Sequence, residues 1–117
     1  MSDKIGLGRK GEELAIAYLK SKGFKILAKN RRNRFGEIDI IAKDHGVLVF
    51  VEVKTRTTTS FGSPIQAIDA TKQNRLRNLA LRYIAEEGLA DQQVRFDVLC
   101  VLQTPETTKI EHIPNAF

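Results

Sequence analysis

The sequence has little of what small proteins use for covalent crosslinks or zinc sites. Cys100 is the single cysteine among 117 residues, so an internal disulfide cannot form. One cysteine and two histidines, His45 and His112, provide no zinc-ligand spacing. Because Cys100 stands in an apolar run, we expect a buried, inert thiol and a reducing compartment.

Long apolar runs are absent as well. No window approaches the roughly 18 apolar residues of a membrane span, and the first residues lack the apolar stretch of a signal peptide. We therefore expect a cytoplasmic protein with no membrane partner. A phosphate-binding glycine loop, a dinucleotide-binding glycine motif and a Ser-His-Asp pattern are also missing, so those enzyme classes are not indicated.

The charge is biased towards the basic side. Nineteen Lys and Arg stand against fourteen Asp and Glu, which gives a net charge of +5. This balance favours a polyanionic partner only weakly, since many basic proteins bind no nucleic acid. The length fits one domain, residues 1–117, and with 42% hydrophobic residues that domain can bury a core without crosslinks.

The apolar patterning predicts alternating helices and strands. We expect helices over 8–22 and 65–87, ended by Gly23 and Gly88, strands over 24–30, 36–43, 47–54 and 94–102, and a further edge strand over 109–113. This α-β-β-β-α-β order predicts an α/β fold with a mixed central sheet flanked by helices. The polar segment 55–64 predicts a loop, either a flap that orders on a nucleic-acid backbone or a plain connection.

The hairpin of the second and third expected strands carries the most informative residues. The dipeptide His45-Gly46 suits a two-residue turn, because glycine adopts positive φ freely and histidine tolerates it. That turn places Asp39 directly opposite Glu52, with Lys54 on the same face, and Glu37 opposite Lys54. A three-residue turn would shift the register and separate the two carboxylates, so this geometry is conditional on the turn.

Two opposed carboxylates beside an amine indicate metal-dependent phosphodiester hydrolysis. Asp39 and Glu52 repel each other unless a proton or a cation lies between them. Mg²⁺ and Mn²⁺ prefer carboxylate oxygens, and the Val53 carbonyl could add a further oxygen. Lys54 would orient or help to deprotonate the attacking water, or neutralise the scissile phosphate. The alternative is a salt-bridged sheet edge, in which Lys54 simply pairs with Glu37 and Glu52.

A basic segment leads into this hairpin. Residues 20–34 contain no acidic residue and predict phosphate contacts, with a solvated surface as the alternative. The aromatic residues near this segment are too few to predict a stacking platform. The side chains that we expect to contact nucleic acid are Lys29, Arg31, Arg32, Arg34, Arg56, Gln66, Lys72 and Arg75.

Three further residues have two interpretations each. Glu12 could favour the dipole at the start of the first helix, or supply one more carboxylate to the hairpin. Arg95 and Asp97 alternate with apolar residues at the start of a strand, and we favour structural pairing over catalysis for both.

Four segments of the chain resemble the bacterial YraN-like family, whose members are named as endonucleases by similarity. The segments are Gly11-Glu12, the Gly-Glu-Ile-Asp stretch at 36–39, the Phe-Val-Glu-Val-Lys stretch at 50–54 with Arg56, and the Arg-Phe-Asp stretch at 95–97. The family is similar to archaeal Holliday-junction resolvases and to the PD-(D/E)xK, restriction-endonuclease-like superfamily. That resemblance implies the same α-β-β-β-α-β core.

The resemblance implies a role for each matching residue. Asp39 stands at the position of the superfamily's metal-binding Asp, with Ile38 where many members have proline. Glu52 and Lys54 stand for the (D/E)xK pair, and Glu12 matches a helix carboxylate of the resolvases. The implied metal ligands are Glu12, Asp39 and Glu52, and the implied catalytic residues are Asp39, Glu52 and Lys54.

The resulting hypothesis is an endonuclease that uses Mg²⁺ or Mn²⁺ to cut DNA. Without a base-reading motif, we expect it to select DNA by structure, such as branched or damaged DNA, rather than by sequence. Since the resembling resolvases act as dimers, a homodimer stays open. The alternatives are a non-catalytic nucleic-acid-binding module with a nuclease fold, and a purely structural adaptor.

Overall fold

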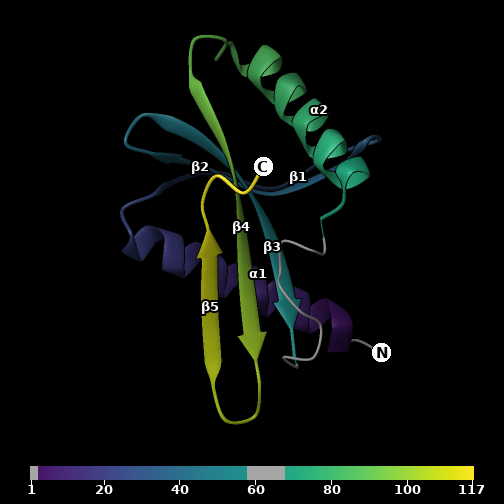
Figure 1. Ribbon diagram of the computed structural model, residues 1–117, viewed down its shortest axis with the longest axis vertical. Helices are drawn as coiled ribbons and strands as arrows, with labels where there is room; N and C mark the ends of the chain where they lie inside the picture. The colour runs from purple at the N-terminus through teal and green to yellow at the C-terminus, as the bar shows by residue number, and fades with distance from the viewer. Residues whose placement is uncertain (1–2, 58–67) are drawn as a thin grey trace.

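Within residues 3–57 and 68–117, which the computed structural model describes, five strands form one mixed sheet between two helices (Figure 1). The elements are α1 (Asp3–Ser21), β1 (Lys25–Asn33), β2 (Gly36–Asp44), β3 (Val47–Arg56), α2 (Ala70–Glu87), β4 (Gln93–Gln103) and β5 (Thr108–Ile113). The strands lie in the order β1-β2-β3-β4-β5, and only β3 and β4 pair in parallel. The expected α-β-β-β-α-β order and mixed sheet are confirmed, with β5 as an edge strand. No helix in the described part of the chain is long and apolar enough to cross a membrane.

Each face of the sheet packs against one helix. Alternate strand residues point to opposite faces, and β3 is apolar on both, as expected of a strand covered on both sides. The face under α1 holds Ala15, Leu19, Phe24, Ile40, Ala42, Val49, Val51, Leu99 and Val101. The face under α2 holds Ile38, Ile41, Leu48, Phe50, Leu79, Ala80 and Tyr83. Strict two-residue alternation would put Ile38 and Ile40 on the same face, but Ile38 lies under α2 and Ile40 under α1, so the alternation of β2 is interrupted between them.

Both helices begin at positions that differ from the sequence-based expectation. α1 begins at Asp3 rather than at residue 8, so Gly6 and Gly8 lie inside the helix, where a glycine costs only about 1 kcal/mol relative to alanine. α2 begins at Ala70, since Asp69 is its N-cap and accepts a hydrogen bond from the Lys72 backbone N–H at 2.9 Å. Ile68 therefore precedes the helix, and positions 65–67 lie outside the described residues.

Strands β1 and β3 run further than their apolar residues indicate. β1 continues through Arg31 and Arg32 to Asn33, and β3 continues through Thr55 to Arg56. Backbone pairing with β2 and with β4 keeps these polar residues in strand conformation. The expected loop therefore starts two residues later than residue 55, and positions 58–64 lie outside the described residues.

The turn between β2 and β3 is the expected two-residue turn. His45 has φ of 49° and Gly46 has φ of 85°, the positive values that a tight hairpin requires. Asp44 pairs with Val47, so the predicted register of the hairpin is confirmed from the turn inwards.

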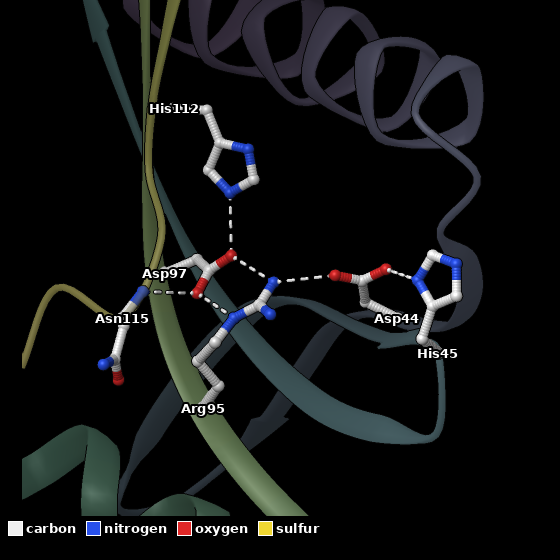
Figure 2. Close-up of polar contacts among 6 residues, drawn as sticks. All are labelled: Asp44, His45, Arg95, Asp97, His112 and Asn115. Carbon is white, nitrogen blue, oxygen red and sulfur yellow. Dashed lines mark hydrogen bonds and ion pairs between the residues drawn. The ribbon is translucent and has the colours of Figure 1, made fainter.

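A buried carboxylate joins the start of β4 to the end of the chain (Figure 2). The Asp97 side chain is fully buried, and it accepts hydrogen bonds from Arg95 Nε at 2.8 Å and from the Asn115 backbone N–H at 2.9 Å. His112 Nε2 lies 2.7 Å from Asp97 Oδ2, and Arg95 also reaches Asp44 at 3.2 Å. The expected structural role of Arg95 and Asp97 is confirmed, since they pair with each other directly.

These contacts decide the acidity of Asp97. Burial on its own raises the pKa of this carboxyl, but the hydrogen bonds from His112, Arg95 and the Asn115 amide outweigh burial and hold the pKa below its ordinary value. The ionised carboxylate therefore stabilises the fold at pH values above its ordinary pKa, and this stabilisation is lost as the pH falls through the lowered pKa.

We expect Asp97→Asn to lower the free energy of unfolding by about 3 kcal/mol at pH 7, because Arg95 loses its buried anionic partner. The difference from the parent should shrink below about pH 4, near the ordinary pKa of an Asp carboxyl. Urea unfolding at pH 7, 5 and 3 measures both effects. Glu106→Gln, on the exposed β4–β5 turn, is the control. An Asp97→Asn variant as stable as this control at pH 7 would contradict the assignment.

Candidate active site

The site lies where the sheet forks between β2 and β3. These strands pair from their turn as far as Ile40 and Val51. Beyond that pair, β2 continues beside β1, whereas β3 continues beside β4. Figure 1 shows the β1–β2 hairpin curving towards α2 while β3 runs beside β4. Asp39 and Glu52 are the next residues after the last pair, so both carboxylates stand at the fork.

The Asp39 side chain takes the place of a missing backbone partner. The Val53 N–H donates a hydrogen bond to Asp39 Oδ2 at 2.8 Å, at a position where β2 no longer offers a carbonyl group. A strand residue directs its N–H and C=O towards the same neighbour. The Val53 carbonyl therefore faces the Asp39 side of β3 as well, in agreement with the expectation that it borders the site.

The surroundings of Asp39 at the fork raise the pKa of its carboxyl. Burial, followed by the nearby Glu52 carboxylate, raises the pKa of Asp39 to about 8, although the Val53 N–H acts in the opposite direction. Near neutral pH the Asp39 carboxyl therefore holds its proton unless a cation takes its place.

Two lysines flank Glu52. Lys54 Nζ lies 3.1 Å from Glu52 Oε2, and Lys72 Nζ, from α2, lies 3.9 Å from the same oxygen. Burial opposes the charge on Lys54, but its contacts with Lys72 and then with Glu52 outweigh burial and raise its pKa. The same contact with Lys54 lowers the pKa of Lys72. The structure thus brings together Asp39, Glu52 and Lys54 as expected, and it adds Lys72.

One expected pair is wrong. Glu37 was expected opposite Lys54, but β2 has left β3 at that point. Glu37 instead pairs with Arg32 of β1, where Arg32 Nη2 lies 3.5 Å from Glu37 Oε2. The simple salt-bridged edge, with Lys54 between Glu37 and Glu52, is therefore replaced by an arrangement in which Lys54 contacts Glu52 and Lys72.

α1 reaches the fork because of a glycine. A Cβ atom at Gly11 would clash with the side chain of Thr55, so a larger residue there would push α1 away from β3. This close approach brings Glu12 towards the site. Burial is the first cause that raises the pKa of Glu12; an Asn30 hydrogen bond opposes it, and the Glu37 and Glu52 charges raise it further.

The three expected metal ligands do not form a compact group of side chains in this structure. Among residues 3–57 and 68–117, no group of three or more His, Cys, Asp and Glu side chains is close enough to hold a metal ion. Asp39 and Glu52 form a pair at the fork, and Glu12 acts on both through its charge. The metal site therefore stays a prediction.

Some of the basic residues have partners within the protein. Arg31 Nη2 lies 3.3 Å from Glu86 and 3.6 Å from Glu87, and its guanidinium covers the Tyr83 ring at 4.9 Å, so it fastens β1 to α2. Arg56 is half-buried and acts on the Cys100 thiol: burial raises the pKa of this thiol, and the Arg56 charge opposes that rise. The thiol is buried as expected. Both residues have structural roles that the sequence did not indicate.

The other expected nucleic-acid contacts divide between the surface and the site. Lys29, Arg32, Arg34 and Arg75 are exposed and accessible to a large ligand. Lys72 lies in the site itself, and Gln66 lies outside the described residues.

Fold and site together define an α/β protein that has a carboxylate pair and two lysines at a fork in its sheet. Residues 11–101 match the model of the uncharacterised protein family UPF0102. A UPF0102 protein of Thermodesulfovibrio yellowstonii is 51% identical over 97% of this chain and 97% of its own length. One from Nocardia farcinica is 47% identical over 100% of this chain and 93% of its own length. The chain belongs to the UPF0102 family, which confirms the YraN-like resemblance at the family level.

We expect Asp39→Asn to stabilise the metal-free protein at pH 8 and to have little effect at pH 4. A carboxyl with a raised pKa binds its proton more tightly in the folded chain, so stability falls as the pH rises from about 4 to about 8. The amide of the variant would keep an oxygen acceptor for the Val53 N–H without this loss. Because Asp39 is only half-buried, we expect a gain of about 1 kcal/mol, discounted for solvent screening. Thermal unfolding at both pH values measures it.

The control for this measurement is Glu13→Gln, which removes an exposed carboxylate from α1. If Asp39→Asn and Glu13→Gln change stability equally at pH 8, or if Asp39→Asn is the less stable variant there, then the two carboxylates at the fork do not act on each other as described.

Proposed function

We propose that this chain is a metal-dependent endonuclease of the restriction-endonuclease-like superfamily, and that it hydrolyses phosphodiester bonds in DNA. The observation that carries the proposal is the pair Asp39 and Glu52 at the fork, with Lys54 at 3.1 Å from Glu52. Asp39 also accepts the Val53 N–H, but that contact needs only one acceptor; a second carboxylate beside it costs stability unless a cation binds between them, which favours a metal site.

The residues at the fork fit a hard divalent cation. Carboxylate oxygens from Asp39 and Glu52 and the carbonyl oxygen of Val53 are the donor types that Mg²⁺ and Mn²⁺ prefer. Glu12 would supply a third carboxylate from α1. The raised pKa of Asp39 supports this fit, since the pair favours a bound positive charge, which a proton supplies in the absence of metal. When bound, the metal would polarise a phosphate oxygen and favour deprotonation of a water molecule.

The lysines supply the positive charge that a phosphate requires. Lys54 is held beside Glu52 with its side chain 19% exposed, so its ammonium is desolvated and fixed in direction. It would donate to the attacking water or to a phosphate oxygen as negative charge develops there. Lys72, which lies 3.9 Å from the same Glu52 oxygen, would bind the next phosphate oxygen.

The exposed cations around the site support a DNA substrate. Lys29, Arg32 and Arg34 belong to the β1–β2 hairpin and Arg75 to α2, and all four are exposed and would contact phosphates without reading bases. Selection would then depend on the structure of the DNA, such as a branch or a lesion. A cytoplasmic location and a homodimer stay predictions.

We expect Glu52→Gln and Lys54→Ala each to lower the rate of DNA cleavage at least about 100-fold while the fold is retained, because each removes a group that acts on the developing charge. The assay compares a four-way junction, a flap, a single strand and a plain duplex, with Mg²⁺ and with Mn²⁺. Lys109→Ala, an exposed lysine of β5, is the matched control and should cut at the parent rate.

Two results would decide against the enzyme. The first is a parent protein that cuts none of these substrates with either metal, although circular dichroism shows it to be folded. The second is DNA binding that depends on salt but ignores both EDTA and Asp39→Ala, which would identify a non-catalytic nucleic-acid-binding module.

We expect Mn²⁺ to raise the melting temperature of the parent protein and not that of Asp39→Asn. A ligand that binds only the folded state stabilises it by about 2.7 kcal/mol at a concentration of about 100 times its dissociation constant. The effect should grow as the pH rises towards 8, because the metal must displace the Asp39 proton. Glu13→Gln serves again as control, and an equal rise in parent and Asp39→Asn would place any bound metal elsewhere.

A further inference from the structure

A groove separates α2 from the tip of the β1–β2 hairpin. Its volume is about 670 Å³, and its lining includes Phe35, Asn74, Arg75, Asn78, Leu79 and Arg82. The hairpin tip approaches α2 closely at Gly36, where a Cβ atom would lie 3.2 Å from Leu79 Cδ1 and 3.3 Å from Arg75 Cδ. The groove therefore has one wall from the exposed side of α2 and one wall from the hairpin.

The hairpin wall presents a partly exposed aromatic ring that two arginines contact. Phe35 is 44% exposed, and the guanidinium carbons of Arg82 and Arg34 lie 3.9 Å and 4.9 Å from its ring centroid. The backbone of Phe35 is fixed as well, since its N–H donates to Asn33 Oδ1 at 2.7 Å. An exposed ring combined with guanidinium groups is a stacking surface for a flat, electron-rich ligand.

The helix wall presents hydrogen-bonding groups and positive charge. Asn74 and Asn78 lie four residues apart, so their amides project from the same side of α2. Within the described residues, neither amide makes a side-chain hydrogen bond, and the groove lining includes Arg75 and Arg82 but no acidic residue. Amide side chains can pair with the edge of a base, and arginines can bind its phosphate.

The groove is connected to the active site through α2. Lys72 lies 3.9 Å from Glu52, and Arg75, one turn further along the helix, already lines the groove. At about 1.5 Å per residue, Lys72 and Asn78 are about 9 Å apart along the helix axis. This distance is roughly the rise of three stacked nucleotides at about 3.4 Å each. One strand can thus place a phosphate beside Lys54 and a nearby base in the groove.

We propose that this groove binds an unpaired nucleobase of the DNA strand that enters the active site. A paired base has both faces covered by its neighbours and its edge engaged, so only an unpaired base can stack on Phe35 and meet the asparagines. The inference rests on the proposed function for the identity of the ligand, and it names the substrate class: DNA with a single-stranded segment within a few nucleotides of the cleaved bond.

The test measures binding in EDTA, where cleavage plays no part. Fluorescence anisotropy gives the dissociation constants of a short single-stranded oligonucleotide and of its blunt duplex. We expect Phe35→Leu, which keeps an apolar side chain but removes the ring, to weaken binding of the single strand about tenfold and to leave duplex binding unchanged. Phe35→Tyr should restore the affinity, and Lys109→Ala should change neither constant.

A second measurement keeps the test decisive if Phe35→Leu does not fold. A single-stranded oligonucleotide that contains 2-aminopurine should lose fluorescence on binding the parent protein, because the base stacks, and should lose much less with Asn78→Ala. An unchanged single-strand affinity in a folded Phe35→Leu variant, an equal loss for duplex and single strand, or no change in 2-aminopurine fluorescence with the parent would overturn the proposal.

The two proposals fail in different ways. If the protein binds single strands through Phe35 but cuts no DNA with Mg²⁺ or Mn²⁺, the proposed base-binding groove is supported and the proposed nuclease activity is wrong. If cleavage depends on Lys54 but the affinity for single strands does not depend on Phe35, the proposed nuclease activity is supported and the proposed base-binding groove is wrong.

Discussion

The hydrogen bond from the Val53 N–H to the Asp39 carboxylate is the contact on which the site depends. Where β2 leaves β3, a half-buried backbone N–H loses its partner in the sheet, and leaving it unpaired would cost about 1–3 kcal/mol. Asp39 supplies the missing acceptor. The same bond holds this carboxylate in a partly buried position beside Glu52. Burial, followed by the Glu52 charge, raises the pKa of Asp39 to about 8, although the bond itself acts in the opposite direction. The fork leaves one backbone N–H without a partner in the sheet, and the group that replaces this partner is a titratable carboxyl. The path of the strands and the position of the acid at the site therefore have the same cause.

The sequence was sufficient to predict the carboxylate pair, because it depends on a local rule. A two-residue turn at His45-Gly46 sets the register of the hairpin, and the two-residue period of a strand then decides which side chains share a face. The same rule was wrong for Glu37, because it assumes that the two strands stay paired. Whether they do depends on β1, β4 and α2, which draw β2 and β3 in different directions. Those segments are remote in sequence, so the hairpin alone could not locate the fork.

The parts of the site that sequence reasoning missed come from such remote segments. Lys72 could be recognised as a basic residue of α2, but nothing in the chain indicated that it reaches Glu52. Gly11 belongs to a recognised motif, but the need for a glycine there comes from its close contact with Thr55. That contact depends on how α1 packs against β3. For the start of α2 a signal was present: Asp69 is a good N-cap residue, but the apolar spacing that begins at Ile65 outweighed it in the prediction. Arg31 has a second role that the basic run did not indicate, since its side chain fastens β1 to α2 through Glu86; its contact with DNA stays a prediction.

The bend of the β1–β2 hairpin links the fork to the groove. The hairpin curves towards α2 and away from β3 (Figure 1), which opens the fork at Asp39. The same curve brings Gly36 against Leu79 and sets Phe35 beside Arg82. A straight hairpin would continue the β2–β3 pairing and would lose both features at once. Because Lys72 and the asparagines of the groove belong to the same helix, a strand held by its base in the groove would also be held in register with Lys72 at the fork. In this arrangement, selection of an unpaired base and placement of the phosphate follow from a single structural feature, the position of α2 against the bent hairpin, and positioning of this kind is a large part of what a hydrolytic site must supply.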